Sequence, residues 1–178
     1  MIFDFSFEEV MRLSNLKRWG IVEMSRSQSV AEHSYNVAMI AAYIVDRLPN
    51  EARPAGLREA VTNWSLVHDL PELLTGDIPT PIKEEIGEAL KKAERKLFPQ
   101  IMMYKDNVGK LGLAICKVAD LMEAIQFANR FCVDSRKKEI IDEMVWKMEE
   151  VATENLDTDT AIVLDKVMGD IWNEEKTL

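Results

Sequence analysis

Residues 64–81 read Trp-Ser-Leu-Val-His-Asp-Leu-Pro-Glu-Leu-Leu-Thr-Gly-Asp-Ile-Pro-Thr-Pro, and the prediction of the fold starts from this stretch. Apolar residues at helical spacing predict a helix over residues 56–69, with His68 at the end of its buried side. Adjacent side chains on a regular helix point about 100° apart and do not easily share a target. Pro71 disfavours helical geometry at the residue before it and suits the start of a new helix. His68 and Asp69 are therefore predicted to lie at a helix junction, where both side chains can reach one metal ion.

The remainder of the chain also carries apolar residues at helical spacing, and the alternation typical of strands is rare. Ser6 with Glu9, and Ser29 with Glu32, match the capping box that begins a helix. Pro99 is expected to kink or end the helix that contains it. Helices are predicted over residues 6–17, 30–48, 56–69, 71–75, 83–104, 108–132, 136–154 and about 158–172.

The composition is that of an ordinary globular protein. The chain has 178 residues, of which 47% are hydrophobic and 30% are charged, and it has only seven glycines and six prolines. We therefore predict that residues 1–178 form a single all-α domain, a helical bundle. The net charge of −9 argues against binding of a nucleic acid polymer, which needs clustered Lys and Arg. A single nucleotide needs only one or two cations and stays possible as a ligand.

Two features of the sequence bear on location. No apolar run is long enough to cross a bilayer, and the first residues carry acid where a signal peptide carries basic residues. Cys116 and Cys132 form no metal-binding or disulfide pattern, which fits two free thiols in a reducing compartment. We expect a cytoplasmic protein without a membrane partner.

Four residues from three predicted helices are candidate metal ligands: His33, His68, Asp69 and Asp120. A catalytic metal needs donors that converge from several elements. Two nitrogens and two carboxylate oxygens form a borderline-hard donor set. Such a set suits Co, Mn, Zn, Fe or Mg and differs from a structural thiolate site. His33 taken alone also fits an ordinary core histidine. Asp120 lies on an apolar face, where an unpaired carboxylate is costly, so a cation is expected beside it.

Three segments together resemble a known family. They are residues 18–40, which contain Arg-Trp and Ser-Val-Ala-Glu-His-Ser, residues 68–81, and residues 117–120, Lys-Val-Ala-Asp. In order and spacing, over about residues 8–130, they resemble the HD-domain phosphohydrolases, and within these the bacterial 5'-deoxynucleotidases. The resemblance implies a helical bundle of the HD type in which the four candidate ligands hold one divalent metal ion.

The resemblance also implies two catalytic residues. Glu72 would hold or deprotonate a water at the metal. Asp77 would orient that water or protonate the leaving group. Each residue also has an ordinary explanation, because Glu72 suits the first turn of a helix and Asp77 suits a turn.

Four further residues are implied to bind substrate. Arg18 would clamp phosphate with its guanidinium, and Lys83 would supply a second cation. Trp19 would pack against the sugar, where its bulk excludes a 2'-hydroxyl, and Ile21 would touch the base. The ordinary alternatives are solvated surface charges for the two cations and a core aromatic for Trp19.

The sequence leaves several functions open. The first is release of phosphate from a deoxynucleoside 5'-monophosphate by water attack at the α-phosphorus. An alternative is release of tripolyphosphate from dATP, as some viral relatives of this branch do. An alternative of another class is a catalytically silent nucleotide-sensing module. A cyclic-nucleotide phosphodiesterase is disfavoured, since such sites often recruit further histidines and this chain has two. The resemblance also suggests a homo-oligomer.

Overall fold

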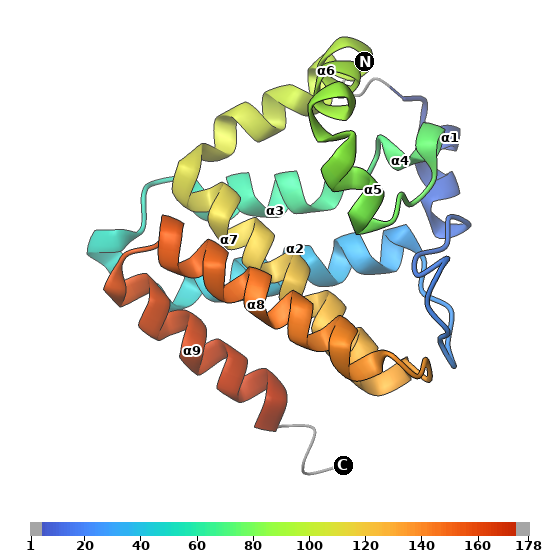
Figure 1. The fold of residues 1–178 in the computed structure, drawn as a ribbon. Coiled ribbons are helices and arrows are strands. Elements are labelled where there is room, and N and C mark those ends of the chain that lie inside the picture. Colours follow the sequence, from blue (N-terminus) through green and yellow to red (C-terminus); the bar gives the residue numbers. More distant parts are fainter. Residues whose placement is uncertain (1–4, 174–178) are drawn as a thin grey trace.

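The structure, a computed structural model, describes residues 5–173 and the side chains of residues 5–169. The prediction of one domain over 1–178 also covers residues 1–4 and 174–178, which lie outside the described residues. The helices, shown in Figure 1, are α1 (Phe7–Met11), α2 (Val30–Arg47), α3 (Leu57–Val67), α4 (Glu72–Thr75), α5 (Thr80–Glu85), α6 (Gly87–Leu97), α7 (Pro99–Phe131), α8 (Lys137–Asn155) and α9 (Thr158–Asn173). Single 3₁₀ turns lie at Arg12–Ser14 and Asn50–Ala52. The predicted all-α class is confirmed.

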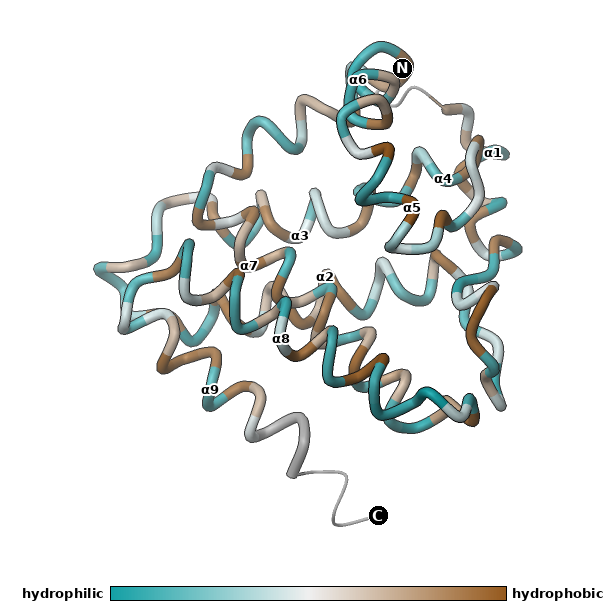
Figure 2. The backbone as a smooth tube through the Cα atoms, viewed as in Figure 1, coloured by the Kyte–Doolittle hydropathy of each residue, from teal (hydrophilic) through white to brown (hydrophobic). Residues whose placement is uncertain are grey.

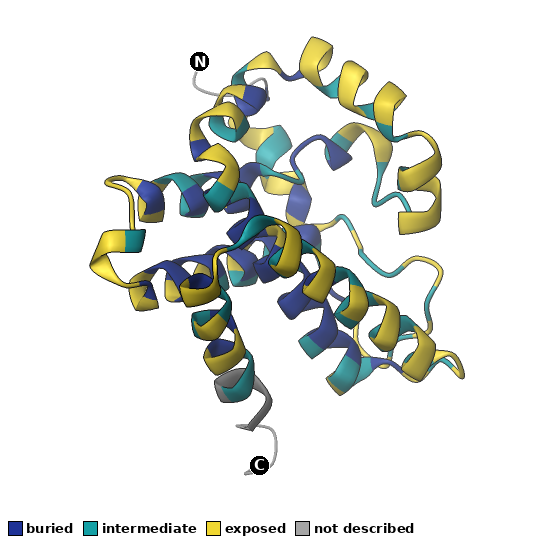
Figure 3. Ribbon diagram, turned by 60° about the vertical axis from the view of Figure 1, so that its left-hand side comes forward, coloured by how far each residue is buried: buried dark blue, intermediate teal, exposed yellow. Residues whose placement is uncertain are grey.

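Helices α2, α3 and α7 pack against one another and form the core, with α8 on α7 and α9 on α2 (Figure 1). Val37, Ile44, Val61 and Ile115 from the three core helices are almost completely buried. Figure 3 shows that burial is concentrated where these helices meet. In contrast, α6 has no buried residue and is coloured mainly as hydrophilic in Figure 2. No helix among the described residues is long and apolar enough to cross a membrane.

The predicted N-terminal caps form with one difference. Ser6 and Glu9 make the complete capping box at α1. At α2 the Ser29 side chain accepts a hydrogen bond from the Glu32 backbone N–H, as predicted. The Glu32 carboxylate instead pairs with Arg26, 2.6 Å away, because the loop before α2 brings a cation within reach.

The region predicted as one helix over 83–104 is three elements. Helix α5 begins earlier, at Thr80, because Pro81 falls in its first turn, where a missing backbone N–H costs nothing. The backbone leaves helical geometry at Ile86 and again at Phe98, so the preceding helix ends just before Pro99, one of the two predicted outcomes, and Pro99 begins α7.

Helix α7 continues through the predicted helix start at residue 108. Its internal break is at Gly109, with φ 72° and ψ 170°. Glycine adopts a positive φ at little cost, so the kink falls at this residue and not at a polar turn. The part of α7 that carries the predicted ligand Asp120 therefore follows directly from the segment that begins at Pro99.

The predicted junction after α3 is present. Helix α3 ends at Val67, His68 is its C-terminal cap, and α4 begins at Glu72 after Pro71. His68 is fixed by a hydrogen bond of 2.7 Å between its Nδ1 and the Ser65 carbonyl. This turn directs the side chains of residues 68 and 69 toward α2 and α7.

Candidate metal centre and substrate pocket

The structure brings together the four predicted metal ligands. His33 Nε2, on α2, lies 3.3 Å from Asp120 Oδ1, on α7, and 3.6 Å from Asp69 Oδ2. His68 Nε2 lies 3.3 Å from the same Asp69 oxygen. One ligand atom each from His33, His68 and Asp120 lies within 4.8 Å of the other two, so this group could hold a metal ion.

The protonation of His33 supports a cation at this point. Its Nδ1 lies 2.6 Å from Glu123 Oε2. An ionised carboxylate only accepts hydrogen bonds, so Nδ1 carries the proton and Nε2 faces Asp69 and Asp120. His33 Nε2 is buried and has no hydrogen-bond partner among the described residues. A nitrogen lone pair beside two carboxylates fits a metal ion of the kind that the donor set predicts.

The pKa values show how strongly these groups depend on opposite charge. Burial and Arg18 lower the pKa of His33, but the neighbouring carboxylates of Asp120 and Glu123 outweigh them, and the pKa is raised. Burial raises the pKa of Asp120, but Lys117 and His33 outweigh it, and the pKa lies well below its usual value. Burial lowers the pKa of His68, which keeps its imidazole neutral and able to bind a metal.

Glu72 lies at the edge of the centre with one oxygen paired and one unpaired. Its Oε1 accepts a hydrogen bond of 2.7 Å from Lys83 Nζ, whereas its Oε2 is buried with no hydrogen-bond partner among the described residues. Burial and the charge of Asp69 raise its pKa to about 7, against the opposing effect of Lys83. A carboxyl with a pKa of about 7 can exchange a proton near neutral pH.

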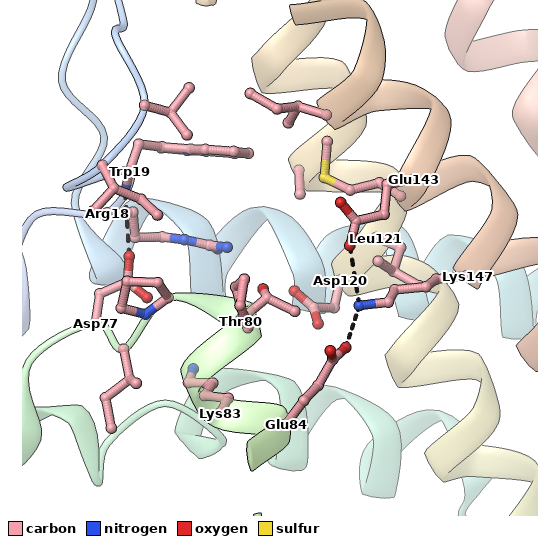
Figure 4. A pocket seen from close by; sticks show the side chains of 18 of the residues that line it. Arg18, Trp19, Asp77, Thr80, Lys83, Glu84, Asp120, Leu121, Glu143 and Lys147 are labelled. Carbon is pink, nitrogen blue, oxygen red and sulfur yellow. Dashed lines mark hydrogen bonds and ion pairs between the residues drawn. The ribbon is translucent and has the colours of Figure 1, made fainter. Parts of the chain in front are cut away.

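A pocket of about 630 Å³ is lined by Asp69, Glu72 and Asp120. Its walls are residues 18–22, the turns around α4 and α5, one face of α7, and α8. Figure 4 shows the Arg18 guanidinium and Asp120 directed into the space between the walls. Arg18 Nη1 is buried without a hydrogen-bond partner among the described residues, and its nearest carboxylate oxygen in an ion pair is Glu123 Oε2 at 3.9 Å.

Trp19 forms one wall of the pocket in a strained backbone conformation. Its φ is 67°, a left-handed value that is uncommon for a bulky residue. Its backbone N–H donates to Asp77 Oδ2 at 3.2 Å, and its ring stacks on Phe127 with 6.2 Å between centroids. Asp77 therefore holds Trp19 in place, a contact that the sequence did not suggest.

The other predicted substrate residues lie on the rim. Ile21 lines the pocket and is 61% exposed, so its side chain is available to a ligand. Lys83 lines the pocket as well, but its ammonium is engaged by Glu72. The predicted phosphate cation is thus also the partner of the predicted base.

Two residues of the centre were missed from the sequence. Glu123 is almost fully buried and accepts hydrogen bonds from His33 and Gln28. The available signal was an acid one turn after Asp120 on the same apolar helix. Gln28 is fully buried although it precedes α2 in a loop, and nothing in the local sequence marks it.

Helix α8 was also given no role in the predicted site. Its residues Ile140, Met144 and Lys147 line the pocket. Lys147 pairs with Glu84 of α5 and with Glu143, as drawn in Figure 4. This ion pair joins the two sides of the pocket mouth.

Sequence comparisons give the family. A family model described as 5'-deoxynucleotidase YfbR-like matches residues 5–103. The dATP triphosphohydrolase of Cyanophage S-2L is 32% identical over 120 residues, which cover 67% of this chain and 67% of the phage protein. A 5'-deoxynucleotidase of Erwinia tasmaniensis is 37% identical over 100 residues, 53% of this chain and 50% of the relative. The match thus spans about half the length of that relative.

Structure comparisons give the same fold. The Cyanophage S-2L HD phosphohydrolase, solved with dA and one catalytic Zn²⁺ ion, superposes with a TM-score of 0.84 at 24% identity, covering 98% of both chains. An HD-domain phosphohydrolase of Listeria innocua superposes with a TM-score of 0.68 at 21% identity, covering 93% of this chain and 87% of the other. The family match and the shared fold confirm the resemblance, and the chain belongs to the YfbR-like family of HD-domain phosphohydrolases.

Proposed function

We propose that the protein is a divalent-metal-dependent phosphohydrolase that releases phosphate from deoxynucleoside 5'-monophosphates. One observation carries the proposal. Two buried polar atoms without hydrogen-bond partners among the described residues, Arg18 Nη1 and Glu72 Oε2, belong to residues that line one pocket with Asp69 and Asp120. Unsatisfied buried polar groups are costly, and a phosphate ester with an attacking water satisfies a cation and a base together.

The four donors His33, His68, Asp69 and Asp120 would hold one divalent ion. Such an ion, when bound, acidifies a nearby water and neutralises charge on phosphoryl oxygens. Glu72 Oε2 takes the proton of the attacking water, since its pKa of about 7 lets it accept a proton near neutral pH. The new bond joins the water oxygen to the α-phosphorus, the bond from phosphorus to O5' breaks, and a proton goes to the departing O5'.

The pocket walls then select and hold the substrate. Arg18 binds the phosphoryl oxygens, with Lys83 as a second cation that keeps Glu72 in place. Trp19 packs against the sugar and leaves no room for a 2'-hydroxyl. Asp77, already bonded to the Trp19 backbone, orients the water or protonates O5'. Ile21 contacts the base from the rim.

The size of the pocket favours a second candidate, release of tripolyphosphate from dATP. The same bond to O5' breaks, so the same residues serve. The volume of about 630 Å³ lies within the range of small-molecule sites, about 300–1,000 Å³, and leaves room beyond a monophosphate. The phage relatives named dATP triphosphohydrolases support this candidate.

A substrate panel tests the proposal. Purified protein loaded in turn with Mn, Co, Zn and Mg is incubated with dAMP, AMP, dATP and ATP, and the products are separated by ion-exchange chromatography. We expect phosphate from dAMP and little from AMP. Tripolyphosphate from dATP without phosphate from dAMP would favour the second candidate, and release of neither product from any deoxynucleotide would contradict both.

A Glu72→Gln variant separates an enzyme from a silent nucleotide-sensing module. Loss of the base is expected to lower turnover by about 10²–10⁴-fold while metal and nucleotide still bind. Nucleotide binding without turnover in the unmodified protein would instead support the sensing module. The homo-oligomer and the cytoplasmic location remain predictions, and sedimentation of the full chain tests the former.

A further inference from the structure

A buried chain of hydrogen bonds joins the metal centre to the wall of the substrate pocket. His33 Nδ1 lies 2.6 Å from Glu123 Oε2. Gln28 Nε2 donates to Glu123 Oε1 at 2.6 Å, and Trp19 Nε1 donates to Gln28 Oε1 at 2.9 Å. His33, Glu123 and Gln28 are each at most 2% exposed, so water does not compete for these bonds.

The chemistry of the two ends allows only one orientation of the middle. The indole N–H of Trp19 can only donate, and the ionised carboxylate of Glu123 can only accept. Both carboxylate oxygens of Glu123 accept, Oε2 from His33 Nδ1 and Oε1 from Gln28 Nε2 and Asn36 Nδ2. Gln28 must therefore direct its amide nitrogen to Glu123 and its oxygen to Trp19.

Helix α7 connects the same three places by its own periodicity. Asp120, Glu123 and Phe127 follow at spacings of three and four residues, which puts them on one face of the helix. Asp120 lies beside the metal ligand His33, Glu123 accepts from the amide of Gln28, and Phe127 stacks on the ring of Trp19. One face of α7 thus touches the metal centre and the strained residue of the pocket wall.

We propose that Gln28 and Glu123 are positioning residues that couple the metal centre to Trp19 and so help to exclude ribonucleotides. The part that concerns the sugar rests on the proposed function. When His33 Nε2 binds a cation, the ring withdraws electron density from Nδ1–H, which becomes a stronger donor to Glu123. The stronger hydrogen bond holds the Glu123 carboxylate in place. The carboxylate positions the Gln28 amide, and the amide positions the indole of Trp19.

Asn36 offers a matched control. Its Nδ2 donates at 3.2 Å to Glu123 Oε1, the oxygen that also accepts from Gln28, but Asn36 does not link Glu123 to Trp19. Gln28→Leu and Asn36→Leu therefore each remove one donor from Glu123. Gln28→Leu also removes the acceptor of the Trp19 indole.

The first experiment follows the indole N–H resonances by NMR while Zn²⁺ is added to the metal-free protein. Trp19→Phe assigns the Trp19 signal, and Trp64, whose ring lies 6.3 Å from that of His68, reports metal binding independently. We expect the Trp19 signal to move with Zn²⁺ in the unmodified protein and in Asn36→Leu. In Gln28→Leu we expect the Trp64 response to remain and the Trp19 response to disappear.

The second experiment measures kcat/KM for dAMP and AMP in the same proteins. Gln28→Leu is expected to lower the preference for dAMP about five- to tenfold, the effect of one lost hydrogen bond, and Asn36→Leu is expected to leave it unchanged. Equal Trp19 responses in Gln28→Leu and the unmodified protein, or an equal loss of preference in both variants, would overturn the proposal.

Two readouts keep this test separate from the proposed function. If the unmodified protein turns over no nucleotide, the proposed function fails, but the NMR result still decides the coupling. If Gln28→Leu does not fold, Trp19→Phe cuts the chain at its other end. In that variant the Gln28 side-chain NH₂ signal should still respond to Zn²⁺, and its failure to respond would count against the coupling.

Discussion

The metal centre and the rim of the pocket differ in how deeply their charged side chains are buried and in how firmly their partners hold them. At the centre, His33 and Glu123 are buried and held by partners that fix the position of each proton. On the rim, Lys147 pairs with Glu84 and with Glu143, and all three side chains are wholly or partly open to water. Exposed ion pairs are worth little, about 0–1 kcal/mol, so a substrate can displace them. The comparison indicates a rigid centre inside a rim that can adapt.

The largest effect is expected at the centre. Asp120→Asn removes a charge that the metal needs, and we expect turnover to fall at least about 10³-fold with loss of tight metal binding. Asp106→Asn on the same helix, in an exposed pair with Arg95, is the matched control and should retain both. Calorimetric titration with Zn²⁺ and a phosphate-release assay measure the two quantities. Equal metal affinity in both variants would remove Asp120 from the proposed ligand set.

The second effect concerns Glu72, at the border between centre and rim. Its folded-state pKa is about 7 against an ordinary 4.5, so the folded metal-free protein binds a proton that the unfolded chain releases. Stability from this residue is present below pH 4.5 and is lost as the pH rises to about 7, by on the order of 3 kcal/mol. Urea unfolding of metal-free Glu72→Gln and unmodified protein between pH 5 and 8 measures it. The unmodified protein should lose stability relative to the variant, and parallel curves would contradict the raised pKa.

The smallest effect compares two glycines. A Cβ on Gly112 of α7 would lie 2.5 Å from Val108 Cγ1 and 3.1 Å from Leu57 Cδ1, whereas a Cβ on Gly87 of α6 meets nothing within 4 Å. Gly112→Ala gains about 1 kcal/mol of helix propensity but overpacks the core by about 1–3 kcal/mol, so a net loss of about 1 kcal/mol is expected. Gly87→Ala should stabilise by a few tenths of a kcal/mol. Thermal unfolding checks the pair, and a stabilised Gly112→Ala would show that the interface of α3 and α7 is loosely packed.

Local rules predicted the all-α class and the junction at His68 and Asp69, but not every helix boundary. Pro71 breaks the backbone whatever the rest of the chain does, so the junction at His68 and Asp69 follows from neighbouring residues alone. The apolar face around Asp120 likewise implies burial from spacing alone. The structure shows the junction, and it places Asp120 partly buried beside His33 and paired with Lys117.

Contacts between distant segments were not predictable in the same way. The partnership of Lys83 with Glu72 and of Gln28 with Glu123 depends on how helices pack, and no local pattern encodes it. The sequence does not predict the kink at Gly109, because glycine adopts helical and left-handed backbones about equally. The candidate metal ligands were therefore easier to predict from the sequence than the residues that hydrogen-bond to the site.

The left-handed backbone of Trp19 has a consequence for protein engineering. Residues in such conformations typically cost about 1–3 kcal/mol and persist only where their surroundings force them. Glycine at position 19 would relieve that strain, but it would also remove the ring that stacks on Phe127 and the N–H that donates to the buried Gln28. A stabilising substitution at this position would therefore have to give up one wall of the pocket.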